Sequence, residues 1–155
     1  THRWARHWTP AVILEGFVYD IPVHDDLHIA RSRVRPIEDR LADLGAIVVL
    51  LTVPSRLVLQ RCVCSTRTHR GPGWAEHLER IAATDTARAA YFRAAQDRLR
   101  RWVHNGPLPV WEIDTTGQDW NRYADHISQH LIGSARGERT GERCARLPPF
   151  EEFCV

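Results

Sequence analysis

The 155-residue sequence contains no methionine and no lysine, so all 21 of its strongly basic side chains are arginine. Without a methionine, we expect the sequence to be a fragment, a processed piece or a trimmed form of a longer protein. Without a lysine, these residues cannot perform Schiff-base chemistry, form a serine–lysine dyad or supply a phosphate-loop lysine. The arginine bias has two explanations: planar contacts with phosphate or carboxylate groups, and the codon usage of a GC-rich genome.

The sequence also lacks long apolar runs and cysteine spacings typical of redox or zinc sites. The longest apolar run, residues 46–53, is far shorter than the ~20 residues that cross a membrane, and no signal-peptide pattern opens the chain. The four cysteines show neither a C-x-x-C pair nor a zinc-binding spacing: Cys62, Cys64, Cys144 and Cys154. We therefore expect a reduced, cytoplasmic protein without a membrane partner. The formal net charge of +2 does not favour nucleic acid as a partner.

Three short apolar segments predict a parallel β-sheet. Residues 11–14 lie between Pro10 and Gly16, which is typical of a fully buried strand. Residues 46–53 are β-branched and apolar on both faces, as in a central parallel strand, and residues 108–114 make a third. Because helical patterns separate these segments, we predict an α/β fold with a three-layer parallel sheet and helices on both faces. Three strands are few for such a sheet, so we expect the fold to be N-terminally incomplete.

Proline and glycine residues mark the predicted ends of the first helical segments. Residues 27–44 have a helical period in which Pro36 predicts a start or a kink, and Gly45 predicts the end. Pro54 suits the first turn of a helix over residues 54–64. The polar, arginine-rich residues 65–73 predict a loop.

The second half of the chain predicts two further helices. Residues 74–104 have a helical period that a capping residue near Thr84 restarts, and residues 120–131 form the last amphipathic helix. Composition then shifts to glycine, arginine and glutamate without any period. We therefore assign residues 1–133 to one α/β domain and residues 134–155 to a flexible tail.

Side chains that follow the first and last predicted strands are candidates for chemistry, because ligands of parallel sheets bind beyond the carboxyl ends of the strands. Glu15 could hold magnesium through water or orient a substrate hydroxyl, or could be a solvated carboxylate. Phe17 and Tyr19 could stack on a base or simply pack. Thr115 and Thr116 could lie beneath an adenine ring or cap the next helix.

Basic side chains of the predicted loop form the remaining candidate. Arg67 and Arg70, with Arg61 one helical turn earlier, suit a lid that neutralises charge during phosphoryl transfer, although a solvated basic loop has the same pattern. Residues 24–28 combine histidine and aspartate, yet the sequence offers no distant third partner. We therefore predict no metal site built by protein ligands alone.

These pieces, in this order, resemble the P-loop kinases of nucleosides and nucleotides, the thymidylate-kinase and deoxynucleoside-kinase type, over about residues 11–132. Four segments carry the resemblance: AVILEGFVYD at 11–20, GAIVVLLTVPSRLVLQR at 45–61, RTHRGPGWAE at 67–76 and WEIDTT at 111–116. It implies ATP-dependent phosphotransfer to a nucleoside or nucleoside monophosphate, with ATP and Mg²⁺ bound. It leaves a homodimer open.

The resemblance also implies roles for individual residues. Three match catalytic positions: Glu15, Arg67 and Arg70. Three match nucleotide-binding positions: Arg61, Thr115 and Thr116. Four fall around the acceptor: Phe17, Tyr19, Arg31 and Arg33.

Two departures from the family pattern matter. Gly16 stands where the family has an arginine, so Arg31 or Arg33 would have to supply that phosphate contact. The Walker A motif G-x-x-x-x-G-K-[ST] is absent, and with it the backbone cradle and lysine that bind the phosphates. We therefore expect this chain alone to be inactive. Two alternatives are a degenerate kinase-like binding domain without catalysis and a P-loop kinase of another small acceptor.

Overall fold

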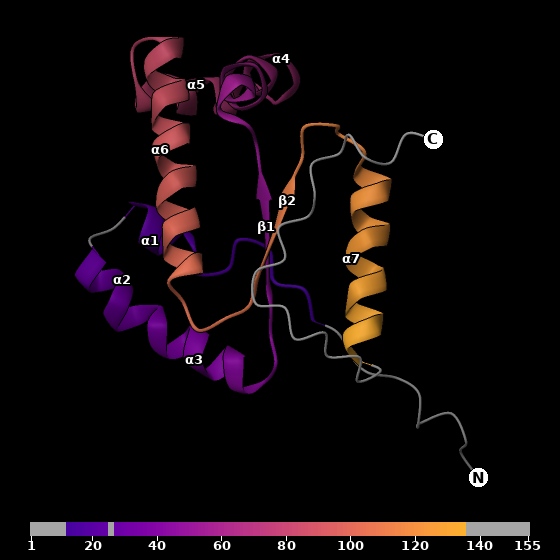
Figure 1. Ribbon diagram of the computed structural model, residues 1–155. Helices are drawn as coiled ribbons and strands as arrows, with labels where there is room; N and C mark the ends of the chain where they lie inside the picture. Colours follow the sequence, from indigo (N-terminus) through magenta and orange to yellow (C-terminus); the bar gives the residue numbers. More distant parts are fainter. Residues whose placement is uncertain (1–11, 25–26, 136–155) are drawn as a thin grey trace.

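The computed structural model describes residues 12–24 and 27–135, and its centre is a parallel pair of strands (Figure 1). β1 (Val48–Thr52) pairs with β2 (Val110–Asp114) in a register that runs from Val48↔Val110 to Thr52↔Asp114. These strands confirm the predictions over residues 46–53 and 108–114, with shorter bounds. Because the pairing is parallel, both carboxyl ends lie at the same edge of the sheet.

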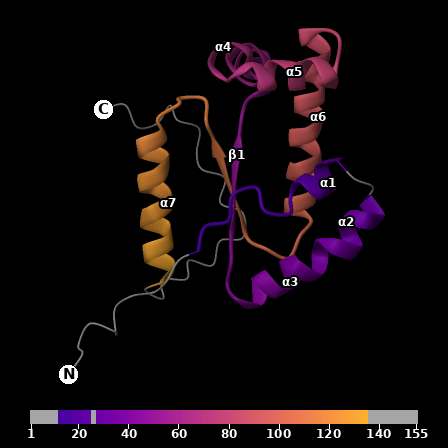
Figure 2. The same ribbon diagram turned by 180° about the vertical axis from the view of Figure 1, so that it is seen from behind.

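Two helices flank this pair on opposite sides: α6 (Asp85–His104) and α7 (Trp120–Ala135) (Figures 1 and 2). Neighbouring residues of β2 face different helices. The Glu112 carboxylate lies 3.0 Å from Nε of Arg100 on α6, whereas the ring of Trp111 lies against His130 of α7. Helices therefore cover both faces of the described sheet. The larger P-loop-type sheet stays a prediction.

The predicted first strand is wrong for the residues that the structure describes. Val12 and Ile13 form no strand and are 81% and 85% exposed. Leu51 of β1 is also half exposed, and β2 is the only strand that pairs with β1 within residues 12–24 and 27–135. β1 is thus an edge strand there rather than a central one. An apolar run becomes a strand only beside a neighbour that supplies backbone partners, which local sequence does not reveal.

Three short helices lead into β1: α1 (Asp20–His24), α2 (Leu27–Arg33) and α3 (Arg35–Asp43). The predicted interruption is confirmed, since α3 starts after Val34 and contains Pro36 in its first turn. Gly45 follows α3 with a φ of +75°, a left-handed conformation that glycine adopts without strain.

The segment after β1 is helical almost throughout: η2 (Ser55–Leu57, a 3₁₀ turn), η3 (Leu59–Cys64, a π-helix), α4 (Ser65–His69) and α5 (Pro72–Ile81). This confirms a helical segment over residues 54–64. The predicted loop over residues 65–73 is wrong for most of its length, because α4 continues directly from η3. Thr68 Oγ1 donates to the Cys64 carbonyl oxygen at 3.0 Å along this continuation. The polar composition reflects exposure, not irregular backbone.

The predicted restart of the long helix is confirmed, because Thr84 Oγ1 accepts a hydrogen bond from the Ala87 N–H at 3.2 Å and caps α6. The last helix is longer than residues 120–131, since α7 continues to Ala135. The remainder of the predicted tail, residues 136–155, lies outside the described residues. None of the helices described combines the length and the apolarity that crossing a membrane would need.

Two hydrophobic clusters stabilise opposite ends of the molecule. The larger joins α2, the strands and the end of α6: Ala30, Val34, Val48, Leu50, Trp102, Val103 and Leu108. The smaller joins η3, α5 and the start of α6, beyond the carboxyl ends of the strands: Val58, Val63, Leu78 and Ala89. The smaller cluster supports the helices that carry the candidate arginines.

Candidate functional site

The loop after β2 is tied to the end of β1 and to η3. Both the backbone N–H and Oγ1 of Thr115 donate to the Thr52 carbonyl oxygen, at 2.9 and 2.8 Å. The Arg61 guanidinium donates to the carbonyl oxygens of Thr115 and Thr116. The structure therefore brings together the three residues that the resemblance implies for nucleotide binding.

Asp114 shapes this loop from the end of β2. Its Oδ1 accepts hydrogen bonds from the Thr116 N–H, at 2.7 Å, and from the Thr116 hydroxyl. The alternative role for the threonines, capping of the next helix, is wrong for these residues. Asp119 Oδ1 instead accepts from the Arg122 N–H at 3.1 Å at the start of α7.

A hollow of about 240 Å³ lies beside this loop, between η3, α4, α5 and α6. Its walls carry basic, aromatic and small polar side chains: Arg61, Cys62, Thr66, Arg70, Trp74, His77, Leu78 and Phe92. The guanidinium of Arg70 lies over the half-exposed ring of Trp74, 4.6 Å from its centroid. Guanidinium groups and aromatic rings are side chains that bind planar anions, and the hollow holds Arg61 and Arg70 beside the rings of Trp74, His77 and Phe92.

Cys62 in the wall of the hollow is not a strong nucleophile. Burial raises the pKa of its thiol, and the charge of Arg61 only partly opposes that rise. The thiol is therefore protonated at neutral pH, and nucleophilic attack requires the thiolate.

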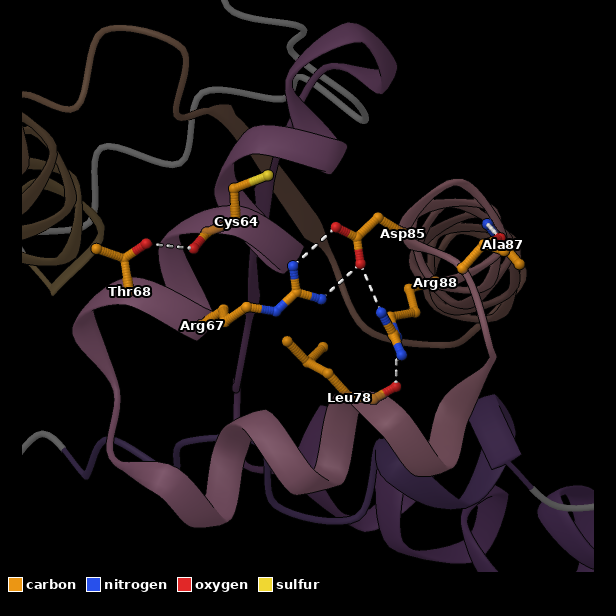
Figure 3. Close-up of polar contacts among 8 residues, drawn as sticks. Cys64, Arg67, Thr68, Leu78, Asp85, Ala87 and Arg88 are labelled. Carbon is orange, nitrogen blue, oxygen red and sulfur yellow. Dashed lines mark hydrogen bonds and ion pairs between the residues drawn. The ribbon is translucent and has the colours of Figure 1, made fainter.

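Arg67 occupies a different position from its predicted one in an open loop. It lies on α4, and its guanidinium binds both carboxylate oxygens of Asp85, one of them at 2.8 Å (Figure 3). Arg88 donates to the same carboxylate and, through Nε, to the Leu78 carbonyl oxygen at 2.7 Å. The hydrogen bonds from these two arginines hold the pKa of the Asp85 carboxyl well below its ordinary value.

The other predicted side chains do not line the hollow. Glu15 and Phe17 are exposed in a turn where Gly16 and Phe17 have φ of +64° and +43°. Tyr19 is half-buried and hydrogen-bonded to Glu38 of α3, and burial followed by the Glu38 charge raises the pKa of its phenol.

Arg31 and Arg33 are also distant from the hollow. Both are exposed on α2, which lies beside the carboxyl-terminal half of α6, whereas α4 and α5 lie at its amino-terminal end (Figures 1 and 2). The structure thus groups Arg61, Arg67 and Arg70 but does not add the predicted acceptor-binding arginines to them.

Sequence reasoning missed Asp85 and Trp74 as site residues, and the hydroxyl of Tyr123, which is buried without a hydrogen-bond partner among the residues described. Asp85 carried only a capping signal, and Trp74 only a helical period. Their roles depend on contacts with residues from other helices, for which the sequence holds no local signal.

A magnesium site held by protein ligands alone does not fit the described residues. Within residues 12–24 and 27–135, no three histidine, cysteine or carboxylate side chains lie close enough to hold one metal ion. His24 instead lies 3.0 Å, through Nδ1, from the Tyr91 hydroxyl. Asp25 and Asp26, from the candidate run at residues 24–28, lie outside the described residues.

Comparison with family models, with curated proteins and with solved structures gives no match to this chain. The likeness to nucleoside and nucleotide kinases therefore depends on the sequence segments alone, and function has to be argued from the site.

Proposed function

We propose that this chain belongs to a cytoplasmic, ATP-dependent phosphotransferase whose acceptor is a nucleoside or a nucleoside monophosphate. The observation that carries the proposal is the hollow among the helices that lie beyond the carboxyl ends of the parallel strands, where Arg70 and Arg61 lie among aromatic rings. Parallel sheets bind ligands beyond these ends, and a nucleotide presents both a ring to stack and phosphates to pair.

Each part of the site has a task under this proposal. The loop at Thr115 and Thr116, fixed by Arg61, lies against the nucleotide base. Arg70 pairs with the phosphates, and Arg67 adds a second charge when it is released from Asp85. Two guanidinium groups neutralise the charge that spreads over the transferring phosphoryl group. Magnesium, when bound to the phosphates, supplies further neutralisation of this charge.

Nucleotide binding without transfer is the second candidate. Arg61 and Arg67 already contact carbonyl or carboxylate oxygens of the protein, and the sequence has neither a lysine nor a Walker A motif. Such a domain keeps the hollow but lacks the donors that stabilise the transition state.

Calorimetric titration with ATP tests the binding step. The chain should bind ATP, and Arg70→Ala should weaken binding about tenfold, because it removes a charged hydrogen-bond donor from the phosphates. Arg40→Ala is the matched control: it removes one arginine from the exposed pair with Asp43 on α3. Equal affinities for the two variants would contradict the proposed site.

A phosphotransfer assay separates the two candidates. With γ-labelled ATP, Mg²⁺ and thymidine or thymidine monophosphate, this chain should bind nucleotide yet show no turnover, and a longer form that supplies a Walker A motif should transfer the label. Clear turnover by residues 1–155 would show that the Walker A motif is dispensable here. Binding without transfer by any longer form would favour the pure binding domain.

A further inference from the structure

Asp85 is held in the way that proteins hold a bound phosphate. Arg67 from α4 makes two parallel hydrogen bonds to the carboxylate, and Arg88 from α6 adds a third to one of its oxygens (Figure 3). Two-pronged pairing by arginine suits carboxylate and phosphate equally. The carboxylate therefore occupies a site whose geometry also fits an external oxyanion.

The two arginines that bind Asp85 differ in solvent exposure and in their other contacts. The side chain of Arg88 is 8% exposed and also donates to the Leu78 carbonyl oxygen, whereas that of Arg67 is 43% exposed and, among the described residues, donates hydrogen bonds to Asp85 alone. If Arg67 leaves, Arg88 still neutralises the carboxylate. Water reaches both side chains of this pair, which weakens it relative to a buried pair, so Arg67 can exchange partners.

This cluster adjoins the hollow. Thr66 of α4 and Arg70, the residue after α4, both line the hollow, and so does Leu78, whose carbonyl oxygen accepts from Arg88. An oxyanion in the hollow therefore lies next to the helix that carries Arg67.

We propose that Asp85 is an internal substitute for a ligand phosphate, and that a phosphate group entering the hollow takes Arg67 from Asp85 while Arg88 keeps the carboxylate. The ligand class is a diphosphate or longer phosphate chain, because Arg70 and Arg67 then bind separate phosphates. The inference deepens the proposed function, since it concerns the same hollow.

Pyrophosphate, titrated calorimetrically into the full chain, tests the exchange apart from nucleotide recognition. Asp85→Asn should tighten pyrophosphate binding at least threefold, because Arg67 no longer has a competing carboxylate. Glu76→Gln is the matched control, since it removes the same charge from the exposed pair with Arg80 on α5. The gain should disappear when Arg67→Ala is added to Asp85→Asn.

Three results would overturn the exchange: equal gains in Asp85→Asn and Glu76→Gln, a gain that survives Arg67→Ala, or no pyrophosphate binding by any form. If circular dichroism shows Asp85→Asn to be unfolded, the Arg67→Ala variant tests the exchange instead. The Arg67→Ala variant should bind pyrophosphate at least threefold more weakly than the Arg80→Ala variant, and equal affinities would refute the exchange. The exchange and the nucleotide proposal can fail separately. If the chain binds ATP but Asp85→Asn does not tighten pyrophosphate binding, only the exchange is refuted. If Asp85→Asn tightens pyrophosphate binding but the chain binds ATP no more tightly than pyrophosphate, only the nucleotide proposal is refuted.

Discussion

Two clusters of arginine and carboxylate lie at opposite ends of α6, and they differ in how far water reaches them. At the carboxyl-terminal end, Glu38 is 1% exposed and accepts hydrogen bonds from Arg35, at 2.6 Å, and from Trp102 Nε1, at 3.0 Å. At the amino-terminal end, the side chain of Asp85 is 36% exposed.

The buried cluster around Glu38 stabilises the fold. Arg35 also donates to the Trp102 carbonyl oxygen and lies over its ring, 3.9 Å from the centroid, so α3 and α6 share one set of contacts. A buried carboxylate such as Glu38 that loses a partner cannot be hydrated by water instead. Water does reach Asp85 at the amino-terminal end of α6. A charged pair at the amino-terminal end can therefore exchange with a ligand, whereas the pair at the carboxyl-terminal end cannot.

Replacement of Glu38 should have the largest effect. Glu38→Gln should lower the free energy of unfolding by about 3 kcal/mol, because it leaves the Arg35 charge unpaired in a largely buried setting. Urea unfolding followed by circular dichroism measures this loss. The exposed pair of Glu76 and Arg80 supplies the control, Glu76→Gln, whose effect should be under about 0.5 kcal/mol. A loss no larger than that of the control would mean that the two ends of α6 do not differ.

Replacement of Asp85 should lower the free energy of unfolding by an intermediate amount that depends on salt concentration. Asp85→Asn should destabilise the fold less than Glu38→Gln and more than Glu76→Gln, because the mostly buried Arg88 loses its counter-charge. Unfolding at 0.05 M and at 1 M sodium chloride separates the clusters, since salt screens exposed charges and barely reaches buried ones. The loss from Asp85→Asn should shrink at high salt, and that from Glu38→Gln should not. Identical salt responses would contradict the contrast.

Local signals predicted the parts of the fold that are set locally. Pro36, Gly45 and Thr84 mark helix ends through their own backbone or hydroxyl chemistry, and each was correctly placed. The missed features depend on distant partners. Residues 11–14 would need a neighbouring strand to become one, and the helix at Ser65–His69 packs against α5, which the local sequence does not reveal.

The candidate site divides in the same way. The sequence grouped Arg61 with Thr115 and Thr116 only through a resemblance, and the structure joins them through hydrogen bonds between residues far apart in the chain. Nothing in the sequence marked Asp85 as the partner of Arg67, because any exposed carboxylate has the same local pattern. Pairings between helices are the part that a single sequence leaves open.

The contact of α7 with the sheet should give the smallest effect, and it depends on pH. The rings of His130 and His126 lie tilted against Trp111 of β2, and burial, then the charge of His126, lowers the pKa of His130 below its ordinary value of 6.5. As pH falls through 6.5, the unfolded chain binds a proton before the folded chain does, so the free energy of unfolding decreases with falling pH. Thermal unfolding at pH 7.5 and pH 5.5 should show this decrease, and His130→Gln should reduce it. His69→Gln, a change of an exposed histidine on α4, should leave the decrease unchanged. Equal pH responses of the two variants would show that the docking of α7 does not depend on His130.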